Sequence, residues 1–335
     1  MDTETLSFEY RQQEALEQAV EIVNRALKRR AYVHGDDTTG YFNCGKMKHI
    51  FEIDDNNKYI NEQTLDKIVY DIKTFLNDVR IYLKVDGQCG AIAYDPKCDE
   101  YALLTRYDDK KNKFRGMTEL PIGYFKLSSG NIDKYSKAYK KQSHHYYLKV
   151  MPRPLYDDKS KMAKVIRELY GILDKMSVAE RKGRLRNLGF NSCEYVGDKF
   201  QKTPTIIGND IALHREQLLS SKFYPGDKIS YVEHYNILKD MFDNAENKTV
   251  YDVLKEYFGS HGNTIEGFII YHKKQYDSIF YKVRQNVFHK IGYDQYHKKW
   301  CKAIKKNDVD GFLNNSIPPM LLSYKRQYYD MESVD

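Results

Sequence analysis

The chain has 335 residues, of which 41% are hydrophobic and 30% are charged, as in an ordinary globular protein of one large or two small domains. No run of 18 apolar residues occurs, so we expect no membrane-spanning helix. The formal net charge of +7 is compatible with a polyanionic partner, but the charge alone favours a mildly basic solvated surface.

The N-terminal segment MDTETLSFEY is acidic and polar, and it lacks the features of a secretory signal or a transit peptide. The five cysteines are odd in number and none has CxxC spacing, which argues against a structural zinc site or a disulfide framework. We therefore expect reduced thiols, no targeting signal and an intracellular location, cytoplasmic or nuclear.

The first predicted element is an amphipathic helix within the first thirty residues, where Leu16, Val20, Val23 and Leu27 recur at helical spacing. A polar segment from about 34 to 45 contains glycine and predicts a loop. A second helix is predicted over 62–78, because its apolar residues again fall on one face.

From Ile81 onward the pattern changes to short runs of β-branched and aromatic residues, which predict strands. These runs cover 81–85, 91–94, 101–104, 146–150, 267–271 and 280–283. A long helix is predicted over 158–178, and a shorter one over 248–258 that we expect to end at Gly259. Together these elements predict an α+β fold with an antiparallel sheet and helices packed on it.

Lys84 ends an apolar run and precedes Gly87, a residue that permits a sharp turn. A lysine is a nucleophile only when burial or nearby cations lower its pKa enough to release the proton. Lys282 and Arg284 alternate along one predicted strand, so both should face the same side and could supply that charge or bind a triphosphate. Taken singly, these residues are equally well explained as solvated surface charges.

Two carboxylates, Glu194 and Glu266, stand in apolar surroundings, where acids are rarely buried unless they are paired. They could accept ribose hydroxyl groups or bind metal-coordinated water, and strand-end salt bridges are the alternative. Arg106 follows the strand predicted over 101–104, and its forked guanidinium suits a phosphate or a sugar. The order of these residues along the chain is more informative than any one of them.

In this order the chain resembles the covalent nucleotidyltransferase superfamily of RNA ligases, DNA ligases and mRNA capping enzymes. Lys84–Gly87 (KVDG) is similar to motif I of that superfamily, which holds the nucleotidyl-lysine. Glu194–Gly197 (EYVG) looks like motif III, Glu266–Ile269 (EGFI) like motif IV and Lys282–Arg284 (KVR) like motif V. The resemblance covers about 75–290 and implies a nucleotidyltransferase core with an ATP-grasp-like antiparallel sheet.

Within the superfamily, the chain is most similar to the small ATP-dependent 5′-to-3′ RNA ligases of vertebrates and viruses. Those ligases have the pattern Lys-Val-Asp-Gly-x-Cys, whereas DNA ligases and capping enzymes usually carry arginine at the position of Cys89. Only 51 residues follow Arg284, too few for a five-stranded barrel, so we expect no C-terminal OB-fold. The expected domains are an N-terminal helical extension (1–75), an adenylyltransferase core (76–290) and a short tail (291–335).

The resemblance implies a ligase that joins 5′-phosphate and 3′-hydroxyl RNA ends through a lysyl-AMP on Lys84 and an adenylylated RNA end. It implies ATP and Mg²⁺ (or Mn²⁺) as cofactors and RNA as the partner, with no membrane and no obligate protein partner. The implied nucleotide-binding residues are Asp86, Gly87, Arg106, Glu194, Glu266, Lys282 and Arg284, with Glu266 also a metal ligand. His214 is a candidate for stacking on adenine, by its position alone. A capping guanylyltransferase, an RNA-binding protein with a degenerate core and a ligase of nicked DNA stay open as alternatives.

Overall fold

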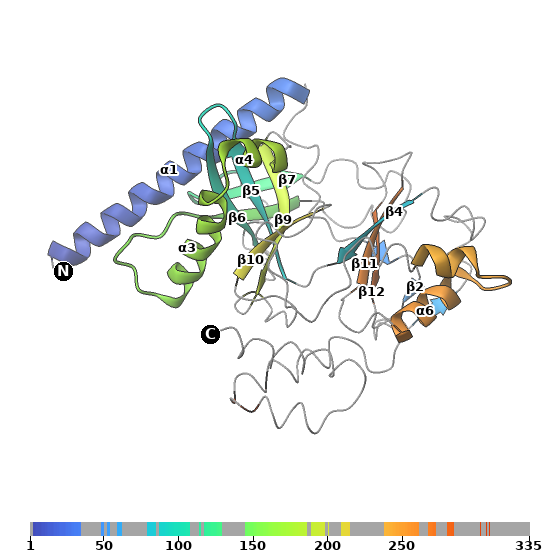
Figure 1. Ribbon diagram of the computed structural model, residues 1–335. Helices are drawn as coiled ribbons and strands as arrows, with labels where there is room; N and C mark the ends of the chain where they lie inside the picture. Colours follow the sequence, from blue (N-terminus) through green and yellow to red (C-terminus); the bar gives the residue numbers. More distant parts are fainter. Residues whose placement is uncertain are drawn as a thin grey trace. The chain divides into compact units, whose positions relative to one another are not determined.

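A computed structural model gives the fold of the chain (Figure 1). The structure describes residues 3–34, 48–49, 52–53, 59–61, 79–84, 87–107, 114, 117–128, 145–185, 189–197, 200, 209–214, 238–260, 267–272, 280–284, 302, 306 and 308. The chain divides into two compact units. The first comprises Met1–Gly45, Gly87–Gln201 and Gly208–Ser221, and the second comprises Lys46–Asp86, Lys202–Ile207 and Lys222–Asp335. The domain boundaries expected at 75 and 290 stay a prediction.

The first unit is built on a six-stranded sheet in the order β10-β9-β5-β6-β8-β7, in which all neighbours are antiparallel. Its strands are β5 (Gln88–Asp95), β6 (Glu100–Tyr107), β7 (Tyr124–Ser128), β8 (His145–Met151), β9 (Gly189–Gly197) and β10 (Asn209–Leu213). The predicted α+β class with an antiparallel sheet is confirmed. Strands β5, β6 and β8 fall where the sequence predicts them, whereas β7, β9 and β10 were not predicted.

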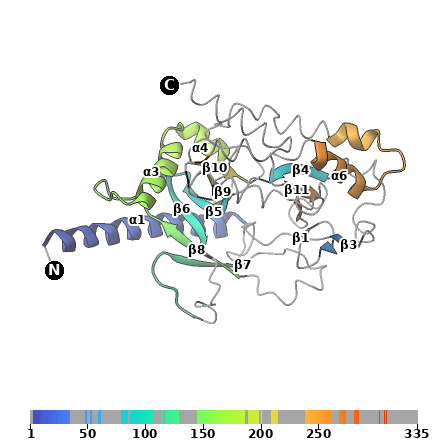
Figure 2. The same cartoon turned by 90° about the horizontal axis from the view of Figure 1, so that it is seen from below.

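Helices cover both faces of this sheet, as Figure 2 shows. Helix α1 (Thr3–His34) buries Ala19, Val23 and Ala26 on one face. The sheet meets it there with small and branched residues, namely Ala91, Ala93, Ala102, Leu104, Leu148 and Val150. Because alanine carries only a methyl group, the helix can lie close to the strands. The helix predicted in the first thirty residues is therefore confirmed, and its apolar stripe covers this face.

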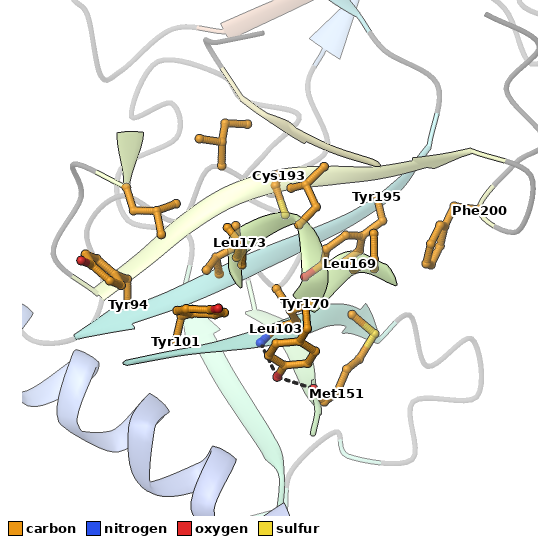
Figure 3. Close-up of a cluster of buried hydrophobic side chains, with 14 of the residues drawn as sticks. Tyr94, Tyr101, Leu103, Met151, Leu169, Tyr170, Leu173, Cys193, Tyr195 and Phe200 are labelled. Carbon is orange, nitrogen blue, oxygen red and sulfur yellow. Dashed lines mark hydrogen bonds between the residues drawn. The ribbon is translucent and has the colours of Figure 1, made fainter. Parts of the chain in front are cut away.

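Helix α3 (Lys161–Asp174) packs on the opposite face, where Leu169, Tyr170 and Leu173 enter a core of larger side chains (Figure 3). The hydroxyl of Tyr170 accepts from the Leu103 backbone N–H at 3.2 Å and donates to the Met151 carbonyl at 2.8 Å. These bonds join the helix to β6 and β8, the two strands that carry Leu103 and Met151. The buried phenol thus both donates and accepts a hydrogen bond, as a buried hydroxyl requires.

The helix predicted over 158–178 is confirmed in α3, which is shorter than predicted at both ends. Helix α3 begins after Ser160, which caps the Ala163 N–H, and it ends at Asp174. Helix α4 (Val178–Arg184) starts after Ser177, which forms a capping box with Glu180. Ser-x-x-Glu is a local signal for a helix start, and it directly follows the apolar stripe of the predicted helix.

The second unit contains a four-stranded sheet in the order β1-β12-β11-β4, with β1 parallel to β12 and the other pairs antiparallel. Its strands are β1 (Lys48–His49), β4 (Val79–Lys84), β11 (Gly267–His272) and β12 (Phe280–Arg284). Strands β2 (Glu52–Ile53) and β3 (Tyr59–Asn61) form a separate pair. Strands β4, β11 and β12 were predicted, whereas β1, β2 and β3 were not.

Helix α6 (Val250–Ser260) belongs to the second unit and buries Tyr257 and Phe258. Both rings lie near Phe268 of β11, with centroid distances of 5.3 and 5.4 Å. The helix runs through Gly259, so the predicted stop at that residue is wrong. The helix predicted over 62–78 and the loop predicted beyond His34 lie outside the described residues. No helix in the described part of the chain is both long and apolar enough to cross a membrane.

Tyr195 of β9 lies over Gly90 of β5 and joins three strands. Its hydroxyl lies 2.9 Å from the Ala91 carbonyl oxygen and 3.0 Å from that of Leu104, so its single hydrogen is shared between β5 and β6. Burial raises the pKa of this phenol well above its usual value, which keeps it in the donating form. A Cβ on Gly90 would come within 2.6 Å of the Leu104 carbonyl oxygen and closer still to the Tyr195 ring. The contact therefore requires glycine at position 90.

We predict that Gly90→Ala lowers the free energy of unfolding by roughly 1–3 kcal/mol, and with it the denaturant midpoint, because the added methyl group clashes with the Tyr195 ring and the Leu104 carbonyl. The matched control is Gly171→Ala within α3, where a Cβ would meet nothing within 4 Å. Alanine favours a helix over glycine by about 1 kcal/mol, so the control should raise the midpoint. Denaturant titration followed by circular dichroism measures both variants. Equal midpoints would contradict the predicted crowding at Gly90.

A second prediction concerns the ion pair between Asp99 and Arg181, which joins the β5–β6 turn to α4. Asp99 also accepts from the Tyr94 hydroxyl at 2.8 Å. The Arg181 guanidinium holds the pKa of Asp99 below its usual value. The pair therefore contributes stability above about pH 4, which is lost as the pH falls through the lowered pKa.

Asp99→Asn tests this pair, since asparagine tolerates the positive φ of 55° at that position while it removes the charge. We expect a loss of roughly 2 kcal/mol at pH 7 and a weaker dependence of stability on pH between 5 and 2. Asp157→Asn is the control, because its pair with Arg11 is half exposed and should contribute little. An unchanged pH dependence in Asp99→Asn would contradict the prediction.

Candidate functional site

Three cations lie on one face of the sheet in the second unit. Lys84 is the last residue of β4 and stands opposite Gly267 of β11, which in turn stands opposite Arg284 of β12. Directly opposite residues of antiparallel strands project to the same face, and so does Lys282, two residues before Arg284. All three side chains are partly exposed. The strand register thus places Lys84, Lys282 and Arg284 on one face of the sheet.

Gly267 separates Lys84 from Arg284 without a side chain of its own. A Cβ at this position would come within 2.9 Å of the Arg284 Cα and closer still to the Val283 carbonyl oxygen. Lys84 and Arg284 are two strand spacings apart, which is roughly 10 Å between backbones. Two long cationic side chains at that separation can reach the same group between them, as a phosphate would require.

The first unit carries a different set of polar residues on the face of its sheet that α1 covers. Glu194 of β9 stands opposite Cys89 of β5. The pairing of Gly90 with Thr105, continued by one residue, brings Cys89 beside Arg106 of β6. Glu194, Cys89 and Arg106 therefore share one face of three adjacent strands, and all are partly exposed.

Gly87, the last residue of the Lys-x-Asp-Gly segment, packs against β9 within the first unit. A Cβ on Gly87 would lie 2.7 Å from Glu194 Cγ and 2.8 Å from Val196 Cγ1. Such distances are too short for real carbon atoms, so a side chain at position 87 would displace Glu194 or the strand. Gly87 and Glu194, which lie far apart in the sequence, are thereby in contact.

His214, directly after β10, connects two side chains of β9. Its Nδ1 lies 2.9 Å from Ser192 Oγ, and its Nε2 lies 3.2 Å from Glu194 Oε2. Its backbone N–H also donates to the Ser192 carbonyl at 3.0 Å, which fixes the ring beside β9. The sequence pointed to His214 for adenine stacking and did not link it with Glu194. The alternation of Ser192 and Glu194 on one strand face was the available signal, but β9 and β10 had not been predicted.

Two of the predicted site residues, Asp86 and Glu266, lie outside the described residues. The described part of the chain contains no group of three or more His, Cys, Asp or Glu that could hold a metal ion. Magnesium bound with a nucleotide is commonly held by one or two carboxylates together with the phosphates, so a three-residue protein cluster is not required. The metal role of Glu266 stays a prediction.

Each unit, taken by itself, carries a chemically distinct set of the predicted residues. The second unit supplies the cations Lys84, Lys282 and Arg284, and the first supplies Gly87, Arg106 and Glu194. Comparison of the chain with models of protein families, with curated proteins and with solved structures gives no match. Function must therefore be inferred from the chain's own residues.

Proposed function

We propose that this chain is an ATP-dependent RNA ligase that carries AMP on Lys84 while it joins a 5′-phosphate to a 3′-hydroxyl. The observation that carries the proposal is the alignment of Lys84, Arg284 and Lys282 on one face of β4, β11 and β12. A nucleophilic lysine needs nearby positive charge to release its proton, and a triphosphate needs cations to bind it. Lys282 and Arg284, on the same sheet face as Lys84, could provide both the positive charge near the lysine and the cations for a triphosphate.

In the first step the amine of Lys84 attacks the α-phosphorus of ATP. A phosphorus–nitrogen bond forms, the bond to the β-phosphate breaks and pyrophosphate leaves. Lys282 and Arg284 contact the α-phosphate and offset the charge that spreads over its oxygens. When bound, Mg²⁺ would neutralise further charge on the triphosphate, with Glu266 as its proposed protein ligand.

In the second step a 5′-phosphate oxygen of RNA attacks the phosphorus of the lysyl-AMP, which releases the amine and forms an adenylylated RNA end. In the third step a 3′-hydroxyl attacks the RNA phosphate, AMP leaves and the strand is joined. Glu194 accepts a ribose hydroxyl of the nucleotide, and Arg106 binds next to it. Asp86 and Gly87 complete the nucleotide-binding set. These roles belong to a nucleotidyltransferase core, which we propose for the α+β fold described above.

RNA is the proposed substrate because Lys84–Cys89 is similar to the first motif of small RNA ligases, with cysteine where DNA ligases usually carry arginine. The net charge of +7 is compatible with a polyanionic substrate. A capping guanylyltransferase would use GTP, and a degenerate RNA-binding protein would form no covalent nucleotide. The nucleotide that becomes attached therefore distinguishes these possibilities.

The main prediction is that the chain becomes covalently labelled by ATP radioactive at the α-phosphate and that Lys84→Ala abolishes the label. Intact-protein mass should rise by one AMP, on the peptide that contains Lys84. Lys255→Ala is the control, because this lysine is exposed on α6 of the same unit and should label normally. A GMP adduct alone, or a label that persists in Lys84→Ala, would contradict the proposal.

Arg284 provides a separate prediction about the phosphate contact. Arg284→Ala should slow adenylylation of Lys84 by on the order of 10²-fold, the loss expected when one preorganised donor to developing charge is removed. Arg284→Lys keeps the charge but not the forked geometry, so its rate should fall between those of Arg284→Ala and the wild type. Single-turnover labelling at saturating ATP measures both variants. Wild-type rates in Arg284→Ala would remove this residue from the phosphate site.

A further inference from the structure

The ring of His214 engages two side chains through its two nitrogens, and the chemistry of those partners fixes its hydrogens. A carboxylate can only accept a hydrogen bond, so the nitrogen facing Glu194 Oε2 at 3.2 Å must carry a hydrogen. In the neutral ring the other nitrogen then accepts, and the Ser192 hydroxyl donates to it at 2.9 Å. The result is a directed chain from Ser192 through His214 to Glu194.

The Glu194 side chain is held at two places along its length. Its Cγ lies where a side chain on Gly87 would stand, so the stem of Glu194 packs against Gly87. Its carboxylate meets His214, and the two side chains are only 16% and 24% exposed. A glutamate on a partly buried strand with a fixed stem has few rotamers, and the bond from His214 selects among them.

We propose that His214 is a positioning residue for Glu194 in nucleotide recognition. By holding Oε2, His214 turns Oε1 toward the 2′-hydroxyl of the bound ribose. This inference depends on the proposed function, because it assigns Glu194 to that hydroxyl. The consequence is nucleotide specificity. With His214 in place the chain prefers ATP to 2′-deoxyATP. Without His214 the Glu194 side chain adopts other rotamers, and this preference falls.

The test compares Lys84 adenylylation by ATP and by 2′-deoxyATP, each radioactive at the α-phosphate, as the ratio of the two kcat/KM values. Both substrates are measured on one preparation, so the ratio does not depend on the fraction of protein that folds. We expect the wild type to prefer ATP. In His214→Ala this preference should fall by about tenfold, the lower end of the effect of partners that orient a ligating side chain.

Two substitutions of similar size separate the contact to Glu194 from simple packing. The amide nitrogen of His214→Gln can take the place of Nε2 and donate to Glu194, so this variant should keep most of the preference. The shorter side chain of His214→Asn can reach Ser192 but not Glu194, so it should behave like His214→Ala. Equal losses in the Gln and Ala variants would overturn the proposal.

A double variant shows whether His214 acts through Glu194. In Glu194→Gln the preference for ATP should already be weak, and adding His214→Ala should lower it no further, because the two residues act as one unit. Independent, multiplying losses would overturn the proposal. An unchanged ratio in His214→Ala would overturn it as well, while wild-type labelling at Lys84 would leave the proposed function intact. If the wild type forms no AMP adduct, both proposals fail.

Discussion

Close approach of β9 to β5 is the constraint on which the first unit depends, and glycine makes it possible. At Gly90 the Tyr195 ring occupies the space of a side chain, and its hydroxyl bridges carbonyls of β5 and β6. At Gly87 the Glu194 stem occupies that space. The same absence of Cβ atoms therefore supports the core on one face of the sheet and orients a candidate binding residue on the other.

A third glycine has a related effect in the second unit. Gly267 stands between Lys84 and Arg284 in the register of β4, β11 and β12 and admits the backbone of β12 at close range. A larger residue would push β12 away and insert bulk between the two cations. Glycine within a strand weakens the sheet locally, and it is tolerated where another group must come close. At Gly267 that group is the β12 backbone, and Lys84 and Arg284 flank this glycine on the two neighbouring strands.

The sequence predicted those parts of the fold that depend on local pattern. Each of the strands β4, β11 and β12 has an apolar run of its own and was predicted. The placement of Lys282 and Arg284 on one face of β12 could therefore be predicted before the pairing of the strands was known. The pairing that brings Lys84 beside Gly267 is a contact between residues far apart in the chain, and periodicity carries no information about it. Strands β9 and β10 were not predicted, so the alternation of Ser192 and Glu194 was not linked with His214, and their contact depends on a pairing that the sequence pattern does not show. Ser177 and Glu180 could have shown the break between α3 and α4, because a capping box is a local signal.

The two units differ in the chemistry that they offer to a ligand. The row formed by Lys84, Lys282 and Arg284 is suited to phosphate oxygens and would bind inorganic polyphosphate or nucleic acid without distinction. The Glu194 carboxylate, oriented by His214 and Gly87, would repel such anions and accepts hydroxyl hydrogens instead. Because Glu194 is held by contacts with Gly87 and His214 inside the first unit, the selectivity that we propose for a ribose hydroxyl depends on the sheet of that unit alone.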